Sequence, residues 1–248
     1  VEPEWMLLSY HKAAYASSSR SGFDPQNAFD ESIKSAWSAT SGNSGEWLSV
    51  DLGKEYNVEA VQVNFADCFT KKKRAPMKEY GGTFTQERYI EEELVRYEYR
   101  IEYSSNGTDW APYEETQNTV FPHKLIPHRA RARYIRIVFA SAPYGQNFSI
   151  SGLRVFGLDN NKKPSAVSGE NAERTSATEA RLSWNSQNDA MGYCIRLGIA
   201  PDKLYNSILL YGQNDYTVTF LNKETEKYYF AVDSFNESGI TKGSINEF

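Results

Sequence analysis

Cysteine, histidine and long apolar runs are scarce in this chain of 248 residues. Its two cysteines, Cys68 and Cys194, lie far apart and form no C-x-x-C spacing, which argues against a disulfide framework and a structural zinc site. The three histidines, His11, His123 and His128, have no spacing to one another or to a nucleophile that indicates a catalytic triad. No apolar run is long enough to cross a bilayer, so the sequence argues against a membrane partner.

Excess positive charge is also lacking. The formal net charge is -5, whereas nucleic-acid-binding proteins carry a strong basic footprint, so we exclude nucleic acid as a partner. The basic run 71–74 is followed by the acidic run 91–93, which cancels much of its field. The chain begins Val-Glu-Pro-Glu, without a methionine or an apolar signal core, and we expect it to be a piece of a longer or processed protein.

Aromatic residues are abundant, with 17 Tyr, 13 Phe and 5 Trp, which suits strands better than helical bundles. Alternation of apolar and polar residues predicts strands over 47–53, 58–65, 96–103, 132–139 and 151–157. We expect the first of these to end at Gly53. Asn106-Gly107 predicts a hairpin turn. The predicted fold class is therefore all-β.

A polar run with a proline, 159–164, marks a domain boundary. Beyond it, alternating segments at 180–184, 192–198 and 228–235 predict a second set of strands. We therefore predict a first domain over 1–158, a linker over 159–164 and a second domain over 165–248.

Three stretches of the first domain, ordered along the chain, resemble the discoidin family, also called coagulation-factor C-type domains, which includes family 32 carbohydrate-binding modules. They are Ala-Phe-Asp-Glu at 28–31, Ser-Ala-Trp-Ser at 35–38 and Glu-Trp-Leu-Ser-Val-Asp-Leu-Gly at 46–53. Glu31 stands where the family has glycine, and Ser35 where it has threonine. The resemblance implies a jelly-roll sandwich, with Trp37 and Trp47 in its core.

The second domain resembles a fibronectin type III (immunoglobulin-like) sandwich. Trp184 would be its core tryptophan and Tyr193 the aromatic residue of the next strand. Leu221, Thr225 and Tyr228 resemble the family's corner motif, in which the tyrosine hydroxyl bonds back to the chain. Here a lysine replaces the proline of that motif, and one extra residue precedes the tyrosine.

In the discoidin family, sugar binds to loops at one end of the sandwich, near a calcium ion. Aromatic faces supply contact area there, while polar side chains fix the hydroxyl groups. The matching loops here are 17–23, 40–45, 69–89 and 141–148. The candidate sugar-binding residues on them are Arg20, Phe23, Asn43, Phe69, Tyr144, Asn147 and Phe148.

The resemblance also implies a calcium site in the loop after the 28–31 motif. Its ligands would be the Asp30 carboxylate, the Ser35 hydroxyl and the carbonyls of Ala28 and Ile33, which are the hard oxygen donors that calcium prefers. The glutamate that the family adds before its last strand is missing, because 149–152 read Ser-Ile-Ser-Gly. Bound calcium and a loop closed by hydrogen bonds alone both stay open.

Catalysis by this chain is not expected, because its acidic residues fall in loops or on wet strand faces and form no evident buried pair. The tandem of domains resembles the carboxy-terminal region of bacterial (Bacteroides-type) glycoside hydrolases such as family 43. It implies a non-catalytic carbohydrate-binding module, a glycan or polysaccharide partner, an upstream catalytic domain and a secreted, periplasmic or cell-surface location. The alternatives are a protein- or cell-surface-binding adhesion module and an enzyme in its own right.

Overall fold

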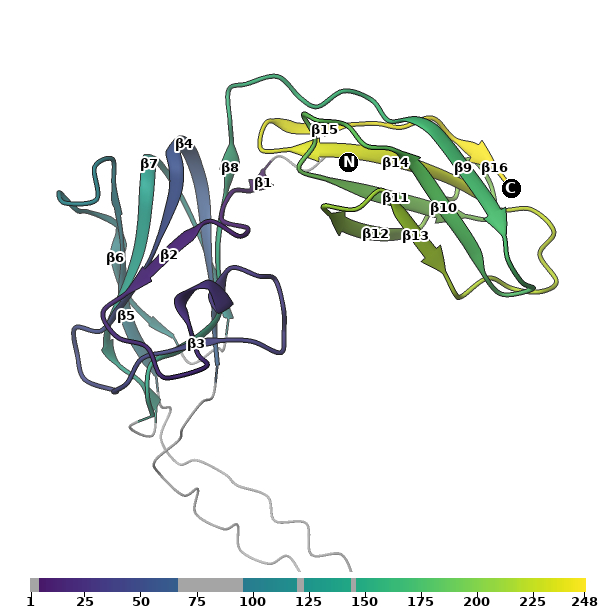
Figure 1. The fold of residues 1–248 in the computed structure, drawn as a ribbon. Coiled ribbons are helices and arrows are strands. Elements are labelled where there is room, and N and C mark those ends of the chain that lie inside the picture. Colours follow the sequence, from purple (N-terminus) through teal and green to yellow (C-terminus); the bar gives the residue numbers. More distant parts are fainter. Residues whose placement is uncertain (1–4, 67–95, 120–122, 144–145) are drawn as a thin grey trace, which may run out of the picture. The chain divides into compact units, whose positions relative to one another are not determined.

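The computed structural model describes residues 5–66, 96–119, 123–143 and 146–248 (Figure 1). Within these ranges nearly all of the regular structure is β-strand, and the one helix is a short 3-10 turn, η1 (Pro25–Ala28), so the all-β prediction is confirmed. The chain divides into two compact units, Leu7–Gly157 and a second made mainly of Leu158–Phe248. Within the described ranges, no helix has the length and apolar character that a bilayer crossing requires.

The described residues of the amino-terminal unit form one sheet of eight strands. They are β1 (Met6–Leu7), β2 (Ala13–Ala16), β3 (Trp37–Ser38), β4 (Trp47–Phe65), β5 (Tyr97–Ser104), β6 (Ala111–Thr119), β7 (His123–Ser141) and β8 (Ser149–Leu158). Their order is β1-β8-β4-β7-β5-β6, with β2 paired to β4 and β3 paired to β8. Alternate residues of these strands enclose one apolar core, in which Trp37, Leu48 and Ile135 have no exposed surface. Trp47 is only half-buried.

Strand β4 runs through the position where the sequence predicts its end. Gly53 has a φ of +90°, which glycine adopts without strain, and the strand continues beyond it to Phe65. The predicted stop at Gly53 is therefore wrong. The register with β7 shifts between Asp51 and Tyr56, and the segment before this shift also pairs with β2. This irregularity lets one long strand serve two groups of neighbours.

The hairpin predicted at Asn106-Gly107 is confirmed. Residues 105–110 join the antiparallel strands β5 and β6, and Gly107 within them has a positive φ of +78°, which glycine adopts without strain. The Asn106 side-chain oxygen accepts hydrogen bonds from the backbone N–H groups of Thr108 and Asp109, both at 2.9 Å. This turn is therefore fixed by its own side chains.

The carboxy-terminal unit holds two antiparallel sheets. Its strands are β9 (Ser168–Arg174), β10 (Ala180–Asn185), β11 (Gly192–Gly198), β12 (Asn206–Tyr211), β13 (Asp215–Val218), β14 (Tyr229–Asn236), β15 (Gly239–Thr241) and β16 (Asn246–Glu247). One sheet has the order β13-β10-β9, and the other has the order β12-β11-β14-β15 with β16 beside β14. Their apolar residues form one separate core cluster.

The aromatic residues singled out in this unit lie in that core. Trp184 and Tyr193 are 3% and 4% exposed, and their rings meet edge to face at 5.3 Å. The Tyr228 hydroxyl accepts a 2.7 Å hydrogen bond from the backbone N–H of Asn222, six residues upstream. This is the back-bond expected of a tyrosine corner.

Candidate functional site

Three segments far apart in the sequence meet at one end of the amino-terminal unit. The Arg20 backbone N–H donates to the Ser38 carbonyl at 2.9 Å, which joins the first loop to β3. The Ala39 N–H donates to the Phe148 carbonyl at 2.8 Å, and the Phe148 N–H donates to the Ser41 carbonyl at 3.3 Å. One continuous end surface is therefore formed by the loops 17–23 and 39–46 and the segment entering β8. The sequence predicts these loops at the same end of the sandwich.

A carboxylate ties two of these segments together. Glu46, just before β4, accepts hydrogen bonds from the hydroxyls of Ser17, Ser18 and Ser41, the last two at 2.8 and 2.7 Å. Partial burial raises the pKa of Glu46, but the three hydroxyls outweigh this effect and hold the pKa below its usual value. The carboxylate therefore stays ionised at neutral pH and clamps the loops 17–18 and 41–46.

Asn147 and its neighbours form the floor beneath these loops. Asn147 is 2% exposed, and its side-chain amide donates to the Ala39 carbonyl at 2.9 Å. The Ser149 hydroxyl donates to the Ser38 hydroxyl at 2.9 Å, and both residues are buried. In this structure Asn147 holds the loops in place rather than facing solvent.

Phe148 also points inward. Its side chain is 1% exposed and stacks on Phe139, with ring centroids 4.3 Å apart. The expectation that Phe148 presents an aromatic face to a sugar ligand is therefore wrong. Burying this ring in the core keeps its apolar surface from water, which outweighs the loop-like appearance of its local sequence.

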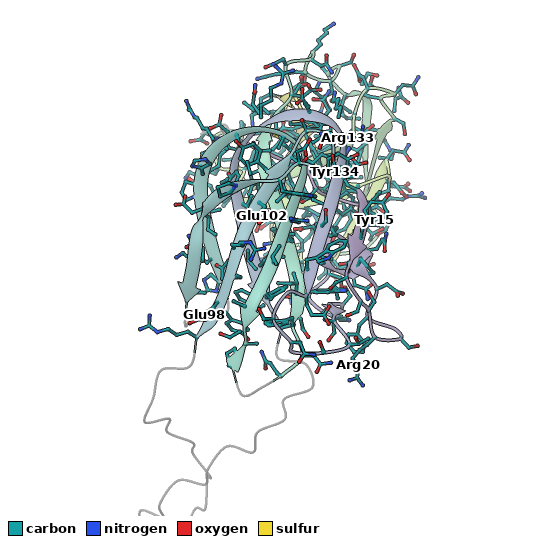
Figure 2. The ribbon with its side chains drawn as sticks, turned by 90° about the vertical axis from the view of Figure 1, so that its left-hand side faces the viewer. Tyr15, Arg20, Glu98, Glu102, Arg133 and Tyr134 are labelled. Atoms are coloured by element: carbon teal, nitrogen blue, oxygen red, sulfur yellow. The ribbon has the colours of Figure 1, made fainter. Side chains whose placement is uncertain are left out.

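The other candidates differ in exposure. Arg20 and Asn43 are exposed and Phe23 is half-buried, and all three lie on the joined loops. Figure 2 shows Arg20 at the end of the unit opposite Arg133 and Tyr134. Phe69 and Tyr144 lie outside the described residues. Arg20, Phe23 and Asn43 are therefore the candidates that the described surface offers.

The proposed calcium loop follows η1. The Asp30 carboxylate accepts a bond from the Ser32 backbone N–H at 2.8 Å and one from the Ser35 hydroxyl at 2.6 Å. Ala28 is buried, whereas the Ile33 side chain is 93% exposed. Two of the expected oxygen donors, on Asp30 and Ser35, are thus side by side. The same hydrogen bonds close the loop by themselves.

Glu31 is the residue that stands where the family has glycine. It has a φ of +59°, a left-handed conformation that favours the glycine usual at this position. Its carboxylate accepts a 2.9 Å hydrogen bond from Arg154 on β8. This ion pair fastens the loop to the last strand of the unit. Among the described residues, no group of three or more His, Cys, Asp or Glu side chains could hold a metal ion.

Buried acids are rare in the described part of the chain. The only carboxylate among its buried residues is Asp233 in the carboxy-terminal unit. It is bound by Arg196 at 2.7 and 2.9 Å and by Lys242 at 3.1 Å. Glycoside hydrolysis needs two carboxyl groups on either side of one bond. The described residues offer no buried pair of that kind.

The arrangement thus defines a β-sandwich with a candidate binding surface on its end loops, the architecture that the discoidin resemblance implies. Residues 13–86 match the family model of the F5/8 type C domain, which confirms that resemblance over this range.

Three solved structures illustrate the similarity of the chain to known proteins. Chitosan-binding module 1 of a chitosanase/glucanase from Paenibacillus sp. IK-5 is 22% identical, with 61% of this chain and 99% of that chain covered and a TM-score of 0.47. A Clostridium perfringens module in complex with GlcNAc-α-1,4-galactose is 14% identical over 63% and 97% of the two chains, with a TM-score of 0.45. A fucose-binding module of Streptococcus pneumoniae is 17% identical over 61% and 95%, with a TM-score of 0.43.

Proposed function

We propose that the amino-terminal unit binds glycan through its end loops and that this chain contains no catalytic centre. The observation that carries the proposal is the joining of the loops 17–23 and 39–46 into one surface within a domain that matches the F5/8 type C model. The Glu46 clamp holds these loops before any ligand arrives, which lowers the entropy cost of binding.

The exposed groups on this surface suit sugar hydroxyls. The Arg20 guanidinium offers several N–H donors, and the Asn43 amide offers both a donor and an acceptor. The half-buried Phe23 adds apolar area on the same loop as Arg20. A few convergent polar groups beside an apolar face are the usual components of a small-molecule site.

On this proposal, the carboxy-terminal unit is a fibronectin type III domain that acts as a spacer or brace. Its two sheets, its core Trp184 and the Tyr228 back-bond support that assignment. The larger protein would be an exported bacterial glycoside hydrolase, secreted, periplasmic or at the cell surface, with its catalytic domain upstream. The module would then keep that enzyme on its polysaccharide.

Calcium is proposed for the loop after η1, held by Asp30, Ser35 and the carbonyls of Ala28 and Ile33. The ion would have a structural role there, because it would hold together the oxygen donors of one loop. With one carboxylate in the set, we expect affinity at the weak end of the range for extracellular modules, about 10⁻³ M.

A glycan array followed by calorimetric titration tests the function. We expect binding at micromolar to millimolar concentration, and Arg20→Ala and Asn43→Ala should each weaken it by about tenfold. The matched control is Arg129→Ala, an exposed arginine on β7 paired with Glu59. Capture of a protein or of liposomes without any sugar binding would refute the proposal and favour the adhesion alternative.

A further inference from the structure

Strand β12 (Asn206–Tyr211) forms one edge of the five-stranded sheet in the carboxy-terminal unit. It pairs along its whole length with β11, from Leu197↔Asn206 to Gly192↔Tyr211. Within the described residues, no second strand pairs with its other side. The outer edge of β12 therefore presents backbone N–H and C=O groups that another strand could use.

The sequence of β12 lacks the usual protection against such pairing. Asn-Ser-Ile-Leu-Leu-Tyr contains no charge, proline or glycine, and the Leu209 side chain is 58% exposed. By contrast, the edge strand β9 of the other sheet carries Glu170, Glu173 and Arg174. The remaining edge strand of that sheet, β13, has only four residues and includes Asp215. Natural proteins block edges with short strands and charges of this kind.

We propose that β12 is a self-association edge, which pairs antiparallel with β12 of a second copy of this chain. Side chains alternate along β12, so Ser207, Leu209 and Tyr211 share the outer face of the sheet, while Ile208 and Leu210 turn towards the core. A two-fold axis at Leu209 keeps this alternation. It places Leu209 opposite Leu209 of the second copy, and Ser207 opposite its Tyr211.

Charge favours a second copy over an oppositely charged partner. In a two-fold arrangement, any charge near the axis faces its own equivalent, and β12 has none. The nearest cation in the register is Arg196, opposite Ser207, and its charge is balanced by Asp233 at 2.7 Å. The Leu209 pair would also remove the largest exposed apolar side chain of the strand from water.

The association should be weak and dependent on concentration. A six-residue edge buries less than the roughly 1,200 Å² at which stable interfaces begin. Sedimentation equilibrium of the whole chain should therefore show a monomer–dimer equilibrium with a Kd above about 10 μM. Leu209→Lys places two like charges on the axis, and we expect it to raise this Kd by at least about tenfold. Because Leu209 is exposed, this variant should keep its fold.

The matched control is Phe220→Lys, which introduces the same charge at a residue that is 52% exposed and outside every strand. Hydrogen exchange should also show slower exchange of the 206–211 amides as the protein concentration rises. A protein that stays monomeric at millimolar concentration refutes the proposal. Self-association that Leu209→Lys leaves unchanged refutes it too, because another surface must then be responsible. Protection of 206–211 that does not depend on concentration would point to cover from within the same chain and would likewise overturn it.

Discussion

Replacing Glu46 by glutamine tests whether one carboxylate organises the candidate sugar-binding loops. The side chain keeps its size, but one acceptor oxygen becomes an NH₂ donor. One of its two oxygens accepts from Ser41 and the other from Ser17 and Ser18, so the amide cannot accept from all three hydroxyls as the carboxylate does. Ser18 also accepts from the Thr40 backbone N–H at 3.0 Å, which extends the effect into the second loop.

The magnitude follows from the number and exposure of these bonds. A hydrogen bond to a charged group contributes about 1.5–3 kcal/mol when it is well shielded. Glu46 is half-buried and the freed hydroxyls can bind water, so we expect a total loss of about 2 kcal/mol rather than the full sum. This loss acts on local opening of the loops, because the apolar core does not depend on Glu46. When exchange follows the equilibrium between closed and open loops, this loss corresponds to about 30-fold faster exchange of the 39–46 amides.

The assay is hydrogen exchange measured by mass spectrometry on peptides from the loops 17–23 and 39–46. Since the folded-state pKa of Glu46 lies below its unfolded value, its stabilisation is complete above the unfolded value. It is lost as the pH falls through the folded value. After correction for intrinsic exchange, wild-type loops should therefore open more in acid, and Glu46→Gln should remove this dependence. Glu55→Gln is the control, because Glu55 forms an exposed pair with Arg131. Loop exchange within about twofold of wild type in Glu46→Gln would refute the clamp.

Three further predictions concern stability and metal binding. Asp233→Asn should destabilise the carboxy-terminal unit by about 3 kcal/mol in calorimetric unfolding, because it leaves Arg196 without its buried anion. The exposed control Glu247→Gln should cost far less, because its ion pair with Lys227 is open to solvent, and equal losses in the two variants would contradict this reasoning. Tyr228→Phe should lower the unfolding free energy of the same unit by about 1 kcal/mol, because the Asn222 backbone N–H loses its partly buried acceptor; unchanged urea unfolding would rule out that role. Millimolar calcium, but not magnesium, should raise the Tm of the wild type and not of Asp30→Asn; a wild-type Tm that calcium does not change would leave the loop closed by hydrogen bonds alone.

Local alternation predicted strands within β4, β5, β7, β8, β10, β11 and β14, and the Asn106-Gly107 pair predicted the hairpin, because each of these signals lies within a few neighbouring residues. The strands β2, β3, β6, β9, β12, β13, β15 and β16 were not among the predicted segments. The course of β4 was not predictable in this way. Gly53 looks like a strand end in sequence, and the register shift that carries β4 onward depends on β7, which lies far along the chain. Trp184 and Tyr193, which the fibronectin type III resemblance placed in the core of the second unit, are both buried there.

The candidate site was less accessible to sequence reasoning. Hydrogen bonds join three of the four predicted loops, and the fourth, 69–89, lies outside the described residues. Phe148 was expected on the surface, but its burial and its contact with Phe139 place it in the core. Glu46 was not singled out, although it is the centre of the loop network. Its three serine partners lie in two separate loops, so the only sequence signal was an acid immediately before a strand, in a serine-rich context.

The direction of β8 has a consequence for how this module can be tethered. The strand starts beside β3 at the end that carries the candidate loops and runs for ten residues, about 33 Å, before the chain leaves the unit at the far end. The incoming chain arrives there too, because β1 pairs with β8 and the Leu8 N–H bonds to the Val155 carbonyl at 2.8 Å (Figure 1). Both attachment points thus lie away from the candidate binding loops. The chain therefore enters and leaves this unit without passing through the end surface that those loops form.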